Sequence, residues 1–255
     1  MEKTVLYKRQ QNVGIITLNR PHRLNAISET LLKDLIEQLK IAGDDEKAVS
    51  IILTGAGKSF CAGEDLKETS AGKTMGQWLR EIDGLQETQR TIMKLGKPII
   101  AAVNGYAVGG GLEFALSCDI RIAANNAKFG FPETSVGLTV TNSGTKLIAQ
   151  IVGLGKAKEL VLAGDIIGAK EALRIGLVNK VVPIKDLMGE TLRICKKLAE
   201  KSPLSLRLTR IAIDQGLHSS FEQILEIEAN HMLLCVASGS QKEFVEKKLR
   251  KMKKN

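Results

Sequence analysis

Residues 97–133 read KPIIAAVNGYAVGGGLEFALSCDIRIAANNAKFGFPE and carry the clearest architectural signal in the chain. PIIAAV (98–103) and DIRIAA (119–124) are short apolar runs typical of buried strands, and three glycines between them lead into the apolar segment LEFAL. Glu113 lies inside that segment, between a leucine and a phenylalanine, where an ionised carboxylate loses most of its water. We therefore predict a strand, a glycine-rich loop, a helix and a second strand, with an acid in the interior.

The same alternation of strand and helix runs through the residues before this stretch. VGIITL (13–18) and VSIIL (49–53) are β-branched runs, and between them apolar residues recur at helical spacing after Ser28, a plausible N-cap. A second helical pattern covers residues 78–93. After about residue 143 helical patterns dominate, and we predict an α/β protein whose C-terminal part is mostly helical. In that part a strand is expected at VNKVV (178–182) and helices near 144–152, 155–163, 168–175, 185–200, 204–215, 221–237 and 241–252.

The composition excludes several classes of protein. With 44% hydrophobic and 25% charged residues in 255, the chain has the composition of a soluble globular protein. No segment approaches the roughly 18 consecutive apolar residues that span a bilayer, so we expect no membrane partner. The four cysteines are far apart and suggest neither a disulfide framework nor a zinc site, which favours a reducing, cytoplasmic location.

The net charge of +9 indicates an anionic partner. Much of the excess lies in the last fourteen residues, where seven lysines and arginines are opposed by two glutamates. This tail is either the solvated face of a helix or a surface that grips phosphate, and the sequence leaves both open.

Two glycine-rich loops match nucleotide-binding motifs only in part. TGAGKS (54–59) lacks the first glycine of a P-loop, because Ile52 stands at that position. GGGLEF (109–114) has Phe114 where a dinucleotide-binding fingerprint needs glycine. We therefore do not expect a nucleotide-binding site.

Glycines also let backbone N–H groups approach a ligand oxygen with no side chain in the way. If Gly110 begins the helix that carries LEFAL, its free N–H points out of the helix end, where the dipole favours negative charge. The N–H of Glu64, in the loop CAGED (61–65), could meet it, and two such donors on one carbonyl oxygen form an oxyanion hole. The alternative is that both loops only make tight turns.

Glu113 has a possible partner in Glu133, which follows the short segment KFGFP. Two carboxylates in a dry pocket raise each other's pKa, so that one can donate a proton while the other accepts one from water. The alternative is a buried ion pair of Glu113 with Arg121 or Lys128.

The sequence does not contain the residue patterns of a metal site, a serine hydrolase or a cysteine nucleophile. The three histidines stand at no metal-ligand spacing, so we expect no metal, and no G-x-S-x-G motif is present. Cys61 and Cys118 border the two loops without an obvious histidine base, and we interpret them as packing residues.

As a set, four motifs resemble the enoyl-CoA hydratase/isomerase family, the crotonases, in order and spacing. They are NRPHRLNAI (19–27), GAGKSFCAGEDL (55–66), residues 97–133 as quoted above, and AKEALRIGLVNKVVP (169–183). The resemblance spans nearly the whole chain. It implies a spiral core of β-β-α units over residues 1–190 and a helical C-terminal region over residues 191–255 used in trimer contacts. It also implies a homotrimer or a dimer of trimers.

The resemblance further implies an acyl-CoA substrate and no separate cofactor, because coenzyme A is part of the substrate. In the family the thioester oxygen is held by the N–H groups that match Glu64 and Gly110. The residue matching Glu113 activates water for attack at the β-carbon, and the one matching Glu133 handles the proton at the α-carbon. Having both glutamates favours a hydratase over the isomerases, which usually keep only the acid that matches Glu133.

Substrate-binding residues are also implied by the resemblance. Arg23, together with Phe244 and Lys247 of the last helix, matches positions that bind coenzyme A. The other implied positions are Ala62, Asp65, Leu66, Gly109, Pro132, Val140, Thr141 and Asn142.

One segment departs from the family pattern. Where relatives usually read Pro-Gly-x-Gly-Gly-Thr, this chain reads VTNSGT (140–145), on what is the acyl side of the site in the family. A branched, cyclic or polar acyl group therefore becomes plausible. Asn142 and Ser143 could hydrogen-bond such a group, or they could cap the helix that begins near Gly144.

The sequence thus predicts an enoyl-CoA hydratase that adds water across the α,β-double bond of a CoA thioester, or catalyses the reverse dehydration. The alternative is another reaction of the family on an acyl-CoA, either double-bond isomerisation or hydrolysis of a cyclic, branched or polar acyl group. A distant alternative is RNA binding through the basic tail, but we do not expect nucleic acid to be the primary partner.

Overall fold

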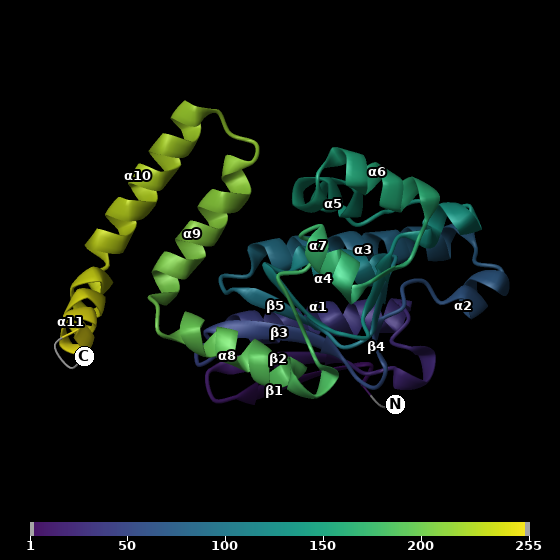
Figure 1. Ribbon diagram of the computed structural model, residues 1–255, viewed down its shortest axis with the longest axis horizontal. Coiled ribbons are helices and arrows are strands. Elements are labelled where there is room, and N and C mark those ends of the chain that lie inside the picture. Colours follow the sequence, from purple (N-terminus) through teal and green to yellow (C-terminus); the bar gives the residue numbers. More distant parts are fainter. Residues whose placement is uncertain (1–2, 253–255) are drawn as a thin grey trace.

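The computed structural model describes residues 3–252 and shows two sheets surrounded by helices (Figure 1). The larger sheet has the strand order β1-β2-β3-β5-β7-β10. β1 pairs antiparallel with β2, and the other neighbouring pairs are parallel. The strands are β1 (Val5–Gln10), β2 (Val13–Leu18), β3 (Ser50–Gly55), β5 (Ile99–Val103), β7 (Ile120–Ala124) and β10 (Lys180–Val182).

The smaller sheet has the order β4-β6-β8-β9. Its strands are β4 (Ser59–Cys61), β6 (Tyr106–Val108), β8 (Lys128–Gly130) and β9 (Ile167–Gly168). β3, β5 and β7 of the larger sheet are each followed in sequence by a strand of the smaller one, β4, β6 and β8. Each turn of the chain therefore adds one strand to each sheet, and parallel pairing stacks the turns into a spiral.

Helices cover both faces of the larger sheet. Along β3, Ile51 and Leu53 face the main hydrophobic cluster, which includes side chains of α1, whereas Ile52 faces a second cluster with side chains of α8. The α-helices are α1 (Glu29–Asp44), α2 (Leu66–Ser70), α3 (Met75–Lys94), α4 (Gly110–Ser117), α5 (Gly144–Val152), α6 (Leu154–Ala163), α7 (Ala169–Arg174), α8 (Leu187–Ala199), α9 (Pro203–Gly216), α10 (Phe221–Ala237) and α11 (Ser240–Met252). Three 3-10 helices are η1 (Pro21–Arg23), η2 (Pro132–Val136) and η3 (Ile184–Asp186).

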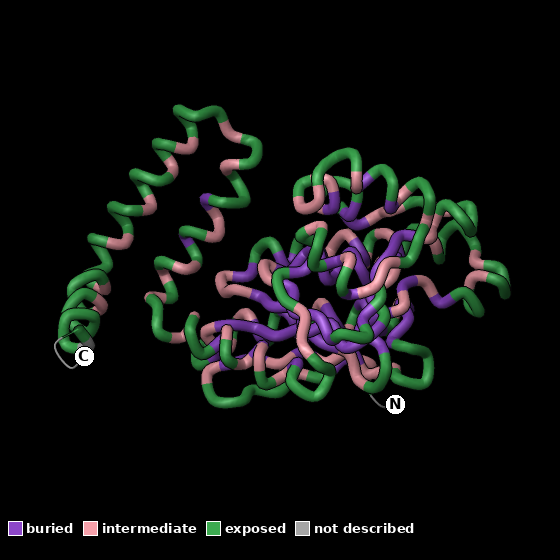
Figure 2. The backbone as a smooth tube through the Cα atoms, in the orientation of Figure 1, coloured by how far each residue is buried: buried purple, intermediate pink, exposed green. Residues whose placement is uncertain are grey.

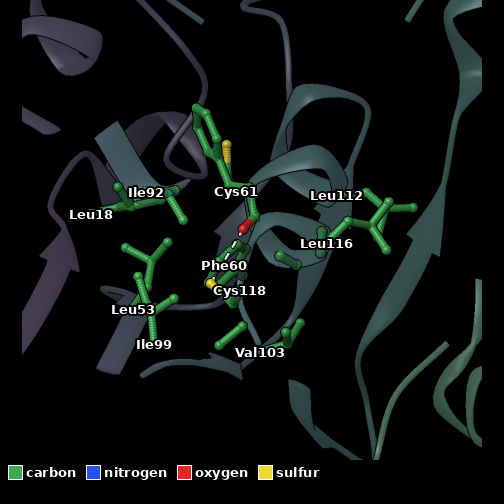
Figure 3. Close-up of a cluster of buried hydrophobic side chains, with 14 of the residues drawn as sticks. Leu18, Leu53, Phe60, Cys61, Ile92, Ile99, Val103, Leu112, Leu116 and Cys118 are labelled. Carbon is green, nitrogen blue, oxygen red and sulfur yellow. Dashed lines mark hydrogen bonds between the residues drawn. The ribbon is translucent and has the colours of Figure 1, made fainter. Parts of the chain in front are cut away.

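Side chains of α4 belong to the main hydrophobic cluster (Figure 3). Leu112 and Leu116 of α4 are buried beside Phe60 of β4, and Leu53 of β3 belongs to the same cluster. This packing fixes the helix that carries Glu113 against the scaffold.

The predicted strands at 13–18, 49–53, 98–103, 119–124 and 178–182 are confirmed to within a few residues, as are the predicted helices from residue 144 onward. β1 and the two- and three-residue strands of the smaller sheet were not predicted from the sequence. Within residues 3–252 no helix has the length and apolar character needed to cross a bilayer.

The last three helices, α9 to α11, form a C-terminal arm (residues 203–252) that extends away from the sheets (Figures 1 and 2). α8 belongs with the sheets, because Leu187 and Cys195 at its two ends pack in the second cluster with Ile52. The predicted boundary after residue 190 falls inside α8, and the division into two regions stays a prediction.

Candidate active site

The site is built around the N-terminus of α4. As predicted, this helix begins at Gly110, directly after Gly109, which adopts a φ of 56°. A Cβ on Gly111 would lie 2.1 Å from the carbonyl oxygen of Cys61, so only glycine lets the helix end pack this closely on β4.

The loop CAGED (61–65) lies against the segment that leads into α4. Gly63 has a φ of 82°, and a Cβ there would lie 2.5 Å from the carbonyl oxygen of Val108. Within residues 3–252 the N–H groups of Glu64 and Gly110 donate to no protein acceptor. An oxyanion hole requires two free donors on adjoining loops. That both N–H groups point at one ligand oxygen stays a prediction.

The carboxylate of Glu113 is buried in a pocket of backbone donors. The residue is 1% exposed, and its Oε1 accepts the N–H of Asn142 at 2.6 Å and the N–H of Gly144 at 3.1 Å. Burial raises the pKa of Glu113 to about 7, the two N–H groups oppose this rise, and the charge of Glu133 adds to it. Glu113 can therefore gain and lose a proton near neutral pH.

The ion-pair alternative for Glu113 is wrong. Arg121 donates to the carbonyl oxygens of Leu177 and Cys118, at 2.8 and 2.7 Å. Lys128 is exposed, and in the part of the chain that the structure describes neither cation bonds to Glu113. With no cation to neutralise it, the buried carboxylate keeps its raised affinity for a proton.

Glu133 approaches the same point from η2. A Cβ on Gly109 would lie 2.9 Å from Glu133 Oε1, so this side chain packs on the turn that precedes α4. Its Oε2 is buried and has no protein partner among the described residues, and burial raises its pKa. We call Glu113 and Glu133 the glutamate pair. Two carboxyl groups with raised proton affinity beside free backbone donors can carry out general acid and base chemistry next to a stabilised oxyanion.

A nearly buried cation, Lys73, pairs with the side chain of Glu64, and this contact was not predicted from the sequence. Lys73 Nζ forms a short ion pair with Glu64, a second at 2.7 Å with Glu81, and lies 4.7 Å from the centre of the Trp78 ring. Burial, and then the nearby Glu64, raise the pKa of Glu81 to about 7, while Lys73 opposes this. This Lys73 cluster ties the loop that carries the Glu64 N–H to α3. Along the chain, Glu64 stands nine positions before Lys73 and Glu81 stands eight positions after it. These spacings follow neither a helical nor a strand period, so the sequence pattern does not reveal the cluster.

Two buried asparagines fasten the loops around the site. Asn25 Nδ2 donates to the carbonyl oxygens of Ala56 and Ser59, at 3.0 and 2.8 Å. Asn104 donates to the carbonyl oxygen of Gly55 at 2.9 Å and accepts its N–H at 3.3 Å. Both asparagines stand in the motifs that carry the family resemblance, and that position was the available signal for them.

Most of the other predicted substrate-binding residues lie on five short segments, of which those with Gly109, Pro132 and Asn142 adjoin the glutamate pair. Asp65 is already engaged, because its side chain accepts the Lys67 N–H at the start of α2 and lies 3.6 Å from Arg20. Ala62 donates its N–H to the carbonyl oxygen of Leu24, directly after η1. The residues on these segments are Arg23 in η1, Ala62, Asp65 and Leu66 after β4, Gly109 before α4, Pro132 in η2, and Val140, Thr141 and Asn142 before α5.

Phe244 and Lys247 are not brought to this point within one chain. They lie on α11 in the C-terminal arm, beyond α8 and α9 from α4 (Figure 1). Lys247 Nζ lies 5.7 Å from the centre of the Phe244 ring. Their role in binding substrate stays a prediction.

The structure confirms Ser143 as the capping position of the helix that begins at Gly144, but not capping by its side chain. Ser143 is the N-cap, with a φ of 63°, but it makes no side-chain capping bond. The amide of Asn142 makes no hydrogen bond to the protein among the described residues.

Among residues 3–252 no three acidic, histidine or cysteine side chains are grouped as ligands. Cys61 and Cys118 are buried, and burial raises the pKa of the Cys61 thiol to about 12 and that of Cys118 as well. Thiols with such raised pKa values remain protonated and act as packing groups.

Known proteins resemble this chain over nearly its whole length. The family model for enoyl-CoA hydratase/isomerase matches residues 8–254. A crotonyl-CoA hydratase of Syntrophomonas wolfei is 38% identical, over 99% of this chain and 97% of that protein. A short-chain-enoyl-CoA hydratase of Clostridium acetobutylicum is 39% identical, over 96% of this chain and 95% of that protein. A crystal structure of an enoyl-CoA hydratase from Bacillus anthracis superimposes with a TM-score of 0.93 at 34% identity, over 97% of this chain and 96% of the other.

Proposed function

The chain belongs to the enoyl-CoA hydratase/isomerase family, and we propose that it adds water across the α,β-double bond of short-chain enoyl-CoA thioesters. It is an enzyme of the hydro-lyase type. The similar proteins of Syntrophomonas wolfei and Clostridium acetobutylicum carry names that specify crotonyl-CoA and short-chain substrates, which supports a short acyl chain here. No cofactor is needed beyond the coenzyme A of the substrate.

In the proposed reaction Glu113 takes a proton from water, and the water oxygen bonds to the β-carbon. The electron pair of the double bond moves to the thioester oxygen, where the N–H groups of Glu64 and Gly110 stabilise the enolate. Glu133 then delivers its proton to the α-carbon. In the reverse dehydration Glu113 donates and Glu133 accepts.

This cycle needs one proton on the glutamate pair as a whole. Hydration begins with the proton on Glu133 and ends with it on Glu113, so the two carboxyl groups titrate as a coupled unit. Burial raises the pKa of both carboxyl groups, so the pair keeps this proton at a higher pH than exposed glutamates do.

The observation that carries the proposal is the pair itself, the buried Glu113 and the half-buried Glu133, both with raised pKa values, at a helix N-terminus with free N–H donors. The test is to incubate the protein with a panel of enoyl-CoA thioesters and to follow the loss of the conjugated double bond by absorbance. Turnover of crotonyl-CoA at about 10 s⁻¹ supports the proposal. Absence of hydration with every member of the panel refutes it.

Double-bond isomerisation and acyl-CoA hydrolysis are the competing reactions on the same scaffold. The segment 140–145, VTNSGT, is what favours a branched, cyclic or polar acyl group over a straight one. Glu113→Gln separates the reactions, because it should abolish hydration and leave a double-bond shift through Glu133 largely intact. The RNA-binding alternative predicts that RNA affinity falls steeply with salt, with a smaller slope when residues 247–254 are removed.

We also propose that the chain forms a homotrimer, or a dimer of trimers, in the cytoplasm. The C-terminal arm exposes large apolar side chains, among them Ile213 (65% exposed), Phe221 (86%) and Leu233 (65%), and a surface of this kind favours association. The four cysteines are unpaired, which agrees with a reducing compartment. Sedimentation of the protein with and without residues 203–255 tests the assembly.

A further inference from the structure

The side chain of Asn142 is a buried polar group without a partner, on a residue whose backbone is bonded to Glu113. Asn142 is 1% exposed, and among the described residues no protein group pairs with its Oδ1 or its Nδ2. A buried polar group left unpaired destabilises the folded state, because it loses its hydrogen bonds to water without replacement. Buried polar groups in folded proteins nearly always have a partner, so this amide indicates a ligand.

The backbone places Asn142 against Glu113. Its N–H donates to Glu113 Oε1 at 2.6 Å, and Gly144 donates to the same oxygen at 3.1 Å. A Cβ on Gly144 would lie 2.6 Å from Val140 and 2.8 Å from Glu113 Oε1, so the segment 140–144 is packed tightly around this carboxylate. The Asn142 amide is therefore one methylene group away from a backbone that is bonded to Glu113.

A third unpaired polar atom belongs to the other member of the glutamate pair. Glu133 Oε2 is buried without a protein partner in residues 3–252. Glu133 lies close enough to Glu113 for its charge to raise the pKa of Glu113. Asn142 and Glu133 thus carry three unpaired polar atoms, and both residues neighbour the carboxylate of Glu113. This arrangement indicates a small polar ligand shared between Asn142 and Glu133.

We propose that Asn142 Nδ2 donates a hydrogen bond to the oxygen that attacks the β-carbon, as the third ligand of the water held by the glutamate pair. This inference rests on the proposed function. The two hydrogens of that water go to the two carboxyl groups, and one lone pair faces the β-carbon, so the second lone pair needs a donor. Glu113 in its ionised form only accepts, and Glu133 keeps its proton for the α-carbon, so the neutral amide supplies the missing donor.

The same oxygen becomes the 3-hydroxyl group of the product. One O–H bond of water breaks as its proton goes to Glu113, the bond from oxygen to the β-carbon forms, and the α-carbon receives the proton of Glu133. Asn142 exchanges no proton and holds the oxygen in line. It therefore acts on ligands with an oxygen at the β-carbon and not on saturated acyl chains.

The test compares Asn142→Leu, which keeps the size of the side chain and removes both polar atoms, with Asn126→Leu, the same change at an exposed residue of the turn between β7 and β8. The kcat/KM for hydration of crotonyl-CoA is measured together with the inhibition constant of butanoyl-CoA, whose chain has no oxygen at the β-carbon. Asn142→Leu should lower kcat/KM by about tenfold or more and keep the inhibition constant within about twofold of the wild type. Asn126→Leu should change neither.

Three results overturn the proposal: an unchanged kcat/KM in Asn142→Leu, a parallel rise in the butanoyl-CoA inhibition constant, or a loss confined to acyl groups that carry a polar substituent. If the wild type itself does not hydrate crotonyl-CoA, the proposed function fails instead. Should Asn142→Leu not fold, Asn142→Ser and Asn142→Ala replace it. The serine hydroxyl can donate, so its kcat/KM should exceed that of the alanine variant by about threefold or more, and equal values refute the role.

Discussion

Glu113→Gln should stabilise the protein at alkaline pH while it removes the base of the proposed reaction. Burial raises the pKa of Glu113 from 4.5 to about 7. Each tenfold change in proton affinity corresponds to about 1.4 kcal/mol, so ionised Glu113 destabilises the folded state by about 3 kcal/mol above neutral pH. Glutamine keeps the shape of the side chain and an oxygen for the N–H groups of Asn142 and Gly144, and it carries no charge.

The sign of the pH dependence follows from the direction of the shift. The pKa of Glu113 is higher in the folded state than in the unfolded state, so its contribution to stability is fully present below about pH 4.5 and is lost as the pH rises through about 7. Urea denaturation at one protein concentration should therefore show similar stabilities for wild type and variant near pH 4.5. At pH 8.5 the variant should be more stable by about 3 kcal/mol.

A matched control isolates the effect of burial. Glu37→Gln makes the same change of charge at an exposed position of α1, and its effect on stability should vary little between the two pH values. If Glu113→Gln and the wild type differ by the same amount at both pH values, the carboxylate is not buried as described, and the argument for its raised pKa fails.

Three further results are expected. The kcat/KM for hydration should give a bell-shaped pH profile, because the glutamate pair is active when it carries one proton. The alkaline limb of this profile should have an apparent pKa near 7. A flat profile from pH 6 to about 9 would contradict the pairing. Lys73→Met leaves the carboxylates of Glu64 and Glu81 facing each other without a cation, so thermal unfolding should show a loss of stability of about 3 kcal/mol. The double variant Lys73→Met/Glu81→Gln should recover part of this stability. If the double variant is no more stable than the single one, repulsion between the two carboxylates does not cause the loss. Gly109→Ala places a methyl group 2.9 Å from Glu133 Oε1 and requires alanine to adopt a φ of 56°. The kcat for hydration should therefore fall by about tenfold or more. Full activity in this variant would show that the glutamate pair does not lie at this turn.

Local spacing in the sequence was enough for the elements and for the interior acid. Apolar runs such as SIIL and IIAAV specify buried strands, and helical periodicity marks the helices from residue 144 onward, because both signals come from residues that are neighbours in the chain. The glycines before α4 likewise predicted a helix that begins at Gly110. Strands of two or three residues, as in the smaller sheet, are too short to show a period, and for this reason they were missed.

Tertiary packing alone decided which groups pair with which. From the sequence, Glu113 could have paired with Arg121. In the structure its carboxylate accepts the N–H groups of Asn142 and Gly144, which stand about thirty positions further along the chain. Arg121 instead donates to the carbonyl groups of Leu177 and Cys118. The Lys73 cluster, the unpaired amide of Asn142 and the distance of α11 from α4 have the same origin. Burial and hydrogen bonding depend on which distant segments the fold places side by side, and residue type and spacing do not encode that placement locally.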